Sequence, residues 1–138
     1  MLPYEGYVRF LVNLSGRRGS VVKYHHHGFG MAQRSKGTLT ADIISSQRPD
    51  ANIVHLGHNH NNYIVRLPRE RLNAKGRVYT DCCWHIRTGG YKPTSNSGDG
   101  WGVERGHGPC ALGAAWLRIR VSKTGNFLDI VVDAFHAS

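Results

Sequence analysis

Two short histidine-rich segments contain the residues of this chain that are best suited to chemistry. One is Gly57-His58-Asn59-His60, and the other is His25-His26-His27-Gly28, which lies upstream of it. Neutral imidazole is the commonest metal ligand in proteins, and a metal site needs several donors that converge on one point. We therefore expect the two segments to share one metal site.

Each segment follows a short apolar run that is typical of a strand ending in a turn. Residues 52–56 precede Gly57, and residues 20–24 precede His25. Between them, residues 38–47 have the apolar spacing of a helix, and a proline follows its end. This order predicts two parallel neighbouring strands joined by a right-handed crossover. Their carboxyl ends would meet at the edge where open α/β sheets bind ligands.

The sequence leaves open which of the three adjacent histidines binds a metal. Side chains alternate along a strand, so His25 and His27 would point one way and His26 the other. His55 lies inside the strand that leads to Gly57, where we expect a packed or surface residue. Structural or exposed roles are expected for the remaining histidines, which lie apart in the sequence: His85, His107 and His136.

The composition is that of a globular domain with a basic surface. The chain has 138 residues, which predicts a single domain over 1–138, and no apolar stretch long enough to cross a membrane. It has no leader-like segment, and its three cysteines do not form an even-numbered, spaced set typical of disulfides, so we expect a cytoplasmic protein. The formal net charge of +9 raises the affinity for phosphate-bearing molecules without indicating sequence-specific recognition.

The rest of the chain has the pattern of strands. We expect strands over residues 7–14, 63–67 and 77–87, with a polar turn over 73–76 between the last two. Residues 89–109 are dense in glycine, serine, asparagine and proline, which predicts a long loop. Residues 115–121 and 127–132 follow as a predicted hairpin.

Together, the two histidine segments resemble motifs of the calcineurin-like metallophosphoesterases. Gly57-His58-Asn59-His60 is similar to that family's GHxH motif, and His26-His27-Gly28 is similar to its preceding strand-end histidine. The segment from Arg87-Thr88-Gly89 through Pro109 and Trp116 further resembles versions found in bacterial-virus genomes. The resemblance covers most of this chain but only the C-terminal half of the family's domain. It implies an α/β fold that is part of a metallophosphoesterase-type β-sandwich flanked by helices.

The resemblance also implies a function, a cofactor and a set of ligands. The function would be metal-dependent hydrolysis of phosphate mono- or diesters, nucleic acid among them. In that family two divalent transition metals hold a hydroxide that attacks phosphorus. Carried over to this chain, His26 or His27 would bind one ion together with His58, and His60 would bind the other. Imidazole donors suit Mn, Fe, Zn and Ni alike. A virus-encoded enzyme of this kind would work in the host cytoplasm.

The other motifs of that family are missing from the sequence. No aspartate is followed two residues later by histidine, Gly98-Asp99-Gly100-Trp101-Gly102 begins like GDxxD but ends in glycine, and Gly125-Asn126 precedes Phe127. The bridging carboxylate and the histidine that would stabilise the transition state therefore cannot come from this chain. We expect the C-terminal portion of a longer or split enzyme whose N-terminal half lies elsewhere. The isolated chain should be inactive.

A second interpretation involves no catalysis. The surplus of positive charge also suits a basic nucleic-acid-binding or assembly module of a virus-like genome. Trp84, Trp101 and Trp116 could then serve as stacking surfaces for bases. We favour the competing interpretation, in which these tryptophans pack in the core. Salt-dependent DNA binding that a chelator leaves unchanged would distinguish this module from a metal-dependent enzyme.

Overall fold

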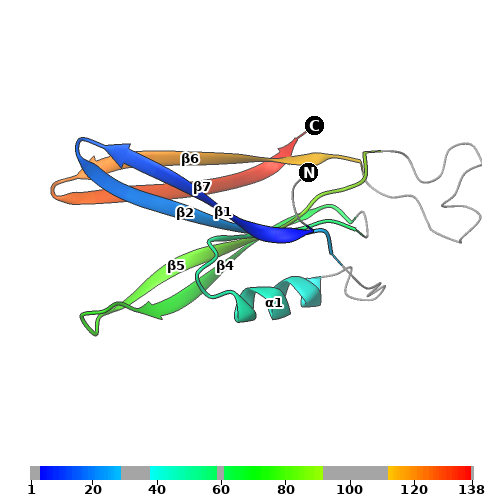
Figure 1. The fold of residues 1–138 in the computed structure, drawn as a ribbon, viewed down its shortest axis with the longest axis horizontal. Helices are drawn as coiled ribbons and strands as arrows, with labels where there is room; N and C mark the ends of the chain where they lie inside the picture. Colours follow the sequence, from blue (N-terminus) through cyan, green and yellow to red (C-terminus); the bar gives the residue numbers. More distant parts are fainter. Residues whose placement is uncertain (1–3, 29–37, 59–60, 92–111, 138) are drawn as a thin grey trace, which may run out of the picture.

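The computed structural model describes residues 4–28, 38–58, 61–91 and 112–137, so most of the loop predicted over 89–109 lies outside the described residues. The described residues form one helix and seven strands, shown in Figure 1. In chain order they are β1 (Glu5–Leu14), β2 (Arg17–His26), α1 (Thr38–Gln47), β3 (Ile53–Leu56), β4 (Tyr63–Leu72), β5 (Val78–Arg87), β6 (Ala114–Thr124) and β7 (Phe127–Ala137).

The first five strands form one mixed sheet in the order β1-β2-β3-β5-β4, and β6 pairs with β7 in a separate two-stranded sheet. β3 runs parallel to β2 on one side and to β5 on the other. β1 and β4 are antiparallel to their neighbours at the two edges. The predicted strand–helix–strand unit is therefore confirmed, with α1 over the residues expected of the helix. The fold is of the α/β type, as predicted.

The five-stranded sheet lies between two covering layers. Figure 1 shows α1 on one face of the sheet and the β6–β7 hairpin over the other. A cluster around Val54 and Leu56 packs against Ala41 and Ile44 of α1. On the opposite face, a second cluster around Ile53 packs against inward-facing residues of the β6–β7 hairpin. Successive residues of β3 thus point into different layers, and each layer buries its own apolar core.

The strands of the hairpins extend further toward their turns than the sequence predicted. β2 begins at Arg17, because Ser15 and Gly16 alone make the turn from β1, both with positive φ. Two central residues with positive φ form the turn that fits the twist of paired strands. β4 continues through Pro68, which an edge strand tolerates because a missing N–H there breaks no inner ladder. The polar turn predicted over 73–76 is confirmed: the side chain of Asn73 accepts two backbone N–H groups there.

The tryptophans divide between the core and the surface. Trp84 packs against the cluster beneath the β6–β7 hairpin, and its indole N–H donates to the carbonyl oxygen of Val132 at 2.9 Å. Trp116 is 62% exposed, so the prediction that it packs in the core is wrong. Trp101 lies outside the described residues. Within the described ranges, no helix is both long and apolar enough to cross a membrane.

Candidate functional site

The two histidine segments meet at the carboxyl ends of the parallel strands β2 and β3. The ladder between these strands ends at His26 and Leu56, and the chain continues directly into both segments. The backbone N–H of Gly57 lies 3.1 Å from the carbonyl oxygen of His27 and 3.3 Å from that of His26, and it donates to both. Beyond this contact, Nε2 of His27 lies 3.4 Å from Nδ1 of His58. The structure therefore brings together two imidazoles that the sequence places far apart.

Glycine at two positions allows this close approach. Gly28 has φ +102°, and a Cβ atom added to it would lie 2.7 Å from the carbonyl oxygen of Gly57 and 2.9 Å from Cβ of His58. A Cβ atom added to Gly57 would in turn lie 3.0 Å from the carbonyl oxygen of His27. At Gly28 the contacts are closer than real Cβ atoms show, so a side chain there requires the backbone to shift. At Gly57 the carbonyl oxygen of His27 would have to move by a few tenths of an ångström. The two glycines set the separation of the histidines.

The backbone of His58 adopts an uncommon conformation. Its φ is +78°, in the left-handed region that residues other than glycine rarely adopt. Such conformations cost roughly 1–3 kcal/mol and cluster at functional sites, where the surrounding structure holds them in place. Here the strain turns the His58 ring toward the ring of His27, with centroids 5.3 Å apart and planes at 72°.

His26 points into a different environment from its neighbours. Its Nδ1 accepts the backbone N–H of Gly28 at 2.7 Å, which closes the turn after β2. A neutral imidazole whose Nδ1 is an acceptor carries its proton on Nε2. His26 could therefore bind a metal only after giving up this hydrogen bond or changing its tautomer. Tyr4 supports the same turn: its hydroxyl donates to the carbonyl oxygen of Gly28, and its ring contacts both His26 and His27.

Two of the four predicted ligands are thus brought face to face. His27 and His58 converge, while His26 lies beside them with its Nδ1 engaged. His60 lies outside the described residues, as does Asn59. Over the described ranges, no group of three or more histidine, cysteine, aspartate or glutamate side chains is arranged to hold a metal ion. The described residues thus bring two imidazoles together and form no complete metal centre.

A cavity of about 470 Å³ lies next to the histidine pair. Its wall includes the three adjacent histidines that end in His27, together with Lys23, His55 and Thr88. Burial lowers the pKa of His55 from its ordinary value of 6.5 to about 4, and the nearby Lys23 and His25 act in the same direction. His55 is therefore a packed, neutral residue at neutral pH, which agrees with one of the two roles expected for it.

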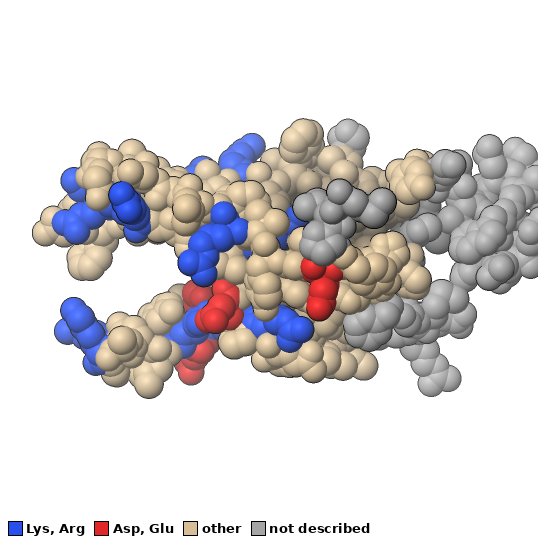
Figure 2. Space-filling model, viewed as in Figure 1, with Lys and Arg blue, Asp and Glu red and all other residues tan. Residues whose placement is uncertain are grey.

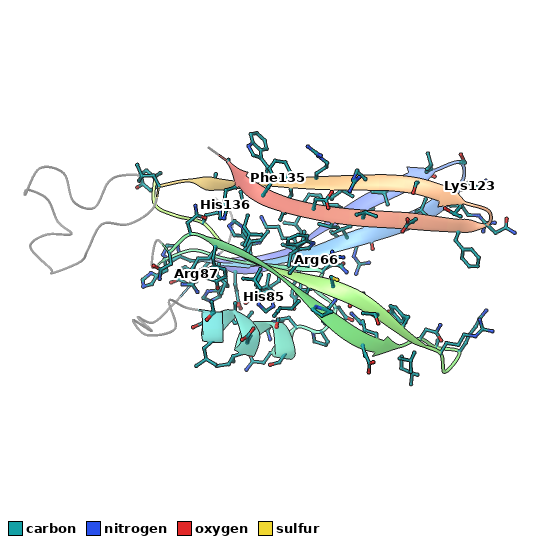
Figure 3. All side chains as sticks on the ribbon, turned by 180° about the vertical axis from the view of Figure 1, so that it is seen from behind. Arg66, His85, Arg87, Lys123, Phe135 and His136 are labelled. Carbon is teal, nitrogen blue, oxygen red and sulfur yellow. The ribbon has the colours of Figure 1, made fainter. Side chains whose placement is uncertain are left out.

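A second polar cluster lies between α1 and β5, and the sequence had not singled it out as part of a site. Nδ1 of His85 lies 3.3 Å from a carboxylate oxygen of Asp42 in α1. Arg87 is fully buried at the end of β5, with its guanidinium carbon 5.9 Å from the ring centroid of Tyr63. Figure 3 shows His85 and Arg87 above α1, with Arg87 nearer the rim.

The signal for this cluster is present in the sequence of β5. A strand covered on both faces is expected to be a continuous apolar run. His85 and Arg87 interrupt such a run at alternate positions, which places both polar side chains on one face. Burial lowers the pKa of His85, while the carboxylate of Asp42 opposes that shift. The arrangement fastens α1 to the sheet close to the histidine pair.

The chain was compared with protein-family models, with curated proteins and with solved structures, and none of the three comparisons found a match.

Proposed function

We propose that this chain carries the histidine side of a metal-dependent phosphoesterase centre. The observation that supports it most is the convergence of His27 and His58 at the carboxyl ends of two parallel strands. The proposed substrates are phosphate mono- or diesters, nucleic acid among them. The net charge of +9 favours such anionic substrates because it raises their concentration near the protein surface.

The separation of the two imidazoles fits a shared transition metal. Two nitrogens bound at about 2.0–2.1 Å to one tetrahedral ion lie about 3.3–3.4 Å from each other. The distance between Nε2 of His27 and Nδ1 of His58 is 3.4 Å. Both side chains could therefore bind one ion with little movement. A bound Mn, Fe, Zn or Ni ion would polarise phosphoryl oxygens and lower the pKa of water.

Within this proposal the residues at the carboxyl ends of β2 and β3 have different roles. His27 and His58 hold the ion, and Gly28 and Gly57 keep the two loops close enough for both rings to reach it. His26 supports the turn through its hydrogen bond with the N–H of Gly28, so we assign it a positioning role. Of the three adjacent histidines that the sequence left open, His25, His26 and His27, we propose His27 as the ligand because it faces His58.

The remaining parts of the centre come from the family resemblance. We propose that His60 binds a second ion and that a missing N-terminal half supplies the bridging carboxylate. The mixed sheet and its covering hairpin would then form part of a metallophosphoesterase-type β-sandwich. This part of the proposal rests on the motifs in the sequence, and the α/β fold is compatible with it.

Metal titration by calorimetry tests the proposal directly. We expect the purified chain to bind Zn²⁺ or Mn²⁺, and we expect His58→Ala and His27→Ala each to weaken binding by at least about tenfold, because each removes a ligand. His136→Ala is the matched control, because His136 is an exposed histidine on the other sheet. Equal affinity in the wild type and in His58→Ala would contradict the proposal.

A second candidate is the basic nucleic-acid-binding module. Its specific support is the outer face of the β6–β7 hairpin, where Trp116 is exposed and the guanidinium of Arg118 lies 5.2 Å from the ring centroid of Phe135. Exposed aromatic and arginine side chains can stack on bases. On the face seen in Figure 2, however, Lys and Arg side chains are spread over the molecule with acidic side chains among them, rather than forming one continuous band.

A further inference from the structure

The cavity beside the histidine pair has the features of a binding site for an anion. We infer that it binds a phosphate group through Lys23, His25 and Thr88, next to the phosphate that the histidine pair would act on. The substrate class this implies carries two neighbouring phosphates, as an oligonucleotide does. The implied substrate rests on the proposed function, but anion binding by the cavity does not.

The sheet places these side chains on one face. Lys23 pairs with Ile53 across β2 and β3, and His25 pairs with His55 one step further along. Because residues two apart on a strand share a face, Lys23 and His25 lie on the side of Ile53, beneath the β6–β7 hairpin. His26 and Leu56 lie on the opposite side, toward α1, and they line the cavity as well. The cavity therefore lies at the ends of β2 and β3 and reaches the pair through His27, which also lines it.

One polar atom in the wall of the cavity has no hydrogen-bond partner among the described residues. Nε2 of His25 is buried and has no hydrogen-bond partner in the part of the chain that the structure describes. Leaving a buried polar atom unsatisfied costs free energy. With the ring proton on Nε2 and a small turn of the ring toward the cavity, a phosphate oxygen would accept that N–H and recover the cost. The hydroxyl of Thr88 lies 3.4 Å from Nε2 of His55 and adds a further polar group to the wall.

The charge of the cavity selects an anion. Among the described residues, its lining includes Lys23 and no aspartate or glutamate. Burial lowers the pKa of Lys23, which means that the environment penalises its positive charge. A bound phosphate would offset that penalty, since an ammonium paired with an anion is more stable at partial burial than one alone.

The rest of the wall suits the organic part of a phosphate ester. Val8, Leu56 and the ring of Tyr4 line the cavity together with the polar groups. Small-molecule sites combine mostly apolar walls with a few placed polar groups in this way. A second cavity, about 360 Å³ between the sheet and β7, contains Asp81 and Asp129 against one arginine, Arg66, so its charge does not favour an anion.

Phosphate binding in the absence of metal tests the inference. Inorganic phosphate is titrated into the full chain with EDTA present, and binding is measured by calorimetry and by amide chemical shifts. We expect the wild type to bind phosphate and Lys23→Met to bind it at least about tenfold more weakly, because a charge-assisted hydrogen bond is lost. Lys123→Met is the matched control: Figure 3 shows Lys123 at the end of the molecule opposite Arg87. Absence of phosphate binding in the wild type, or equal binding in Lys23→Met, overturns the inference.

Two further variants keep the result interpretable. Lys23→Arg retains the charge and should bind phosphate within a few-fold of the wild type, and a circular dichroism spectrum of each variant establishes that it is folded. If Lys23→Met fails to fold, His25→Phe replaces it, because it removes the unpartnered Nε2. Retention of full phosphate affinity in folded His25→Phe would contradict a role for that nitrogen.

The substrate class has a separate readout. The dinucleotide pTpT, which carries two phosphates, should bind more tightly than TpT, which carries one, and Lys23→Met should abolish the difference. Equal affinities of the wild type for both would overturn the two-phosphate substrate. His58→Ala should weaken metal binding by at least about tenfold and keep phosphate binding. Failure of the metal proposal and failure of the phosphate site are therefore seen in different titrations.

Discussion

At the rim of the sheet, two glycines control the distance between the histidines. The carbonyl oxygen of Gly57 and Cβ of His58 occupy the space that a side chain at Gly28 would need. The backbone of Gly28 also has φ +102°, which side chains rarely adopt. Both the lack of space and the positive φ therefore require glycine at position 28. The backbone of His58 is constrained as well, since its φ is also positive.

We predict that Gly28→Ala destabilises the protein and separates the histidine pair. The expected loss is about 1–3 kcal/mol in the free energy of unfolding, because both the clash and the positive φ oppose the substitution. Zn²⁺ affinity should fall in parallel. Urea denaturation and metal titration measure the two effects.

Gly76→Ala is the matched control for this variant. Gly76 has φ +73°, but an added Cβ atom would meet nothing within 4 Å. It should therefore lose stability through backbone strain alone and leave Zn²⁺ affinity unchanged. If Gly28→Ala keeps wild-type metal affinity, the close approach of the two loops does not set the site.

Among the elements, the short strand β3 connects every layer of the fold. It is paired on both sides, and Ile53, Val54 and Leu56 are completely buried. His55 is the polar residue within it. Burial, with Lys23 and His25, lowers the pKa of His55 to about 4, so folding keeps this imidazole neutral. The strand that carries His58 to the rim is therefore sensitive to acid.

We predict that His55 makes stability depend on pH between 6.5 and about 4. Below pH 6.5 the unfolded chain protonates His55, whereas the native protein does so only near its folded pKa of about 4. The stabilising effect is complete above pH 6.5 and is lost progressively as the pH falls through this range. Urea denaturation at several pH values measures the slope.

His55→Gln should flatten that slope, because glutamine does not titrate. His136→Gln, at an exposed position of β7, should leave the slope as in the wild type. His85 contributes in the same direction, since burial also lowers its pKa, so some slope will remain in His55→Gln. A slope identical in the wild type and His55→Gln would show that His55 does not titrate as expected.

At the scale of the whole molecule, the site lies at the edge of a sheet that is covered on both faces. α1 and the β6–β7 hairpin bury the two clusters beneath them and hold the parallel strands in register. The rim itself contributes two converging imidazoles, and the described residues bring no carboxylate to them. The proposed binding of one ion therefore does not by itself imply hydrolysis, for which the proposal needs two ions.

We predict that the isolated chain hydrolyses phosphodiesters negligibly even when it binds a metal. Two imidazoles can hold an ion, but without a bridging carboxylate they do not position two ions for in-line attack. Release of p-nitrophenol from bis-p-nitrophenyl phosphate, measured with Mn²⁺ or Zn²⁺, should stay at the level of the metal alone. Hydrolysis above that level that disappears in His58→Ala would contradict this prediction.

The sequence by itself determined much of the local structure. The apolar spacing of residues 38–47 predicted α1, and the two runs that end in histidines predicted parallel strands, because these patterns reflect burial of one face or of both. The outer parts of the hairpins were underestimated. Polar, half-exposed residues such as those of β4 after Leu67 are held in a strand by their partner rather than by their own pattern.

Tertiary structure alone decided how the candidate residues are arranged. The sequence could not show that His27 faces His58 while Nδ1 of His26 accepts from Gly28, because both depend on the approach of a loop from another strand. It also could not place Lys23 and His25 in one cavity, or Arg87 beside Tyr63. Periodicity encodes which side of a strand a residue faces, whereas contacts between strands distant in sequence depend on register and loop path, which only the packed chain fixes.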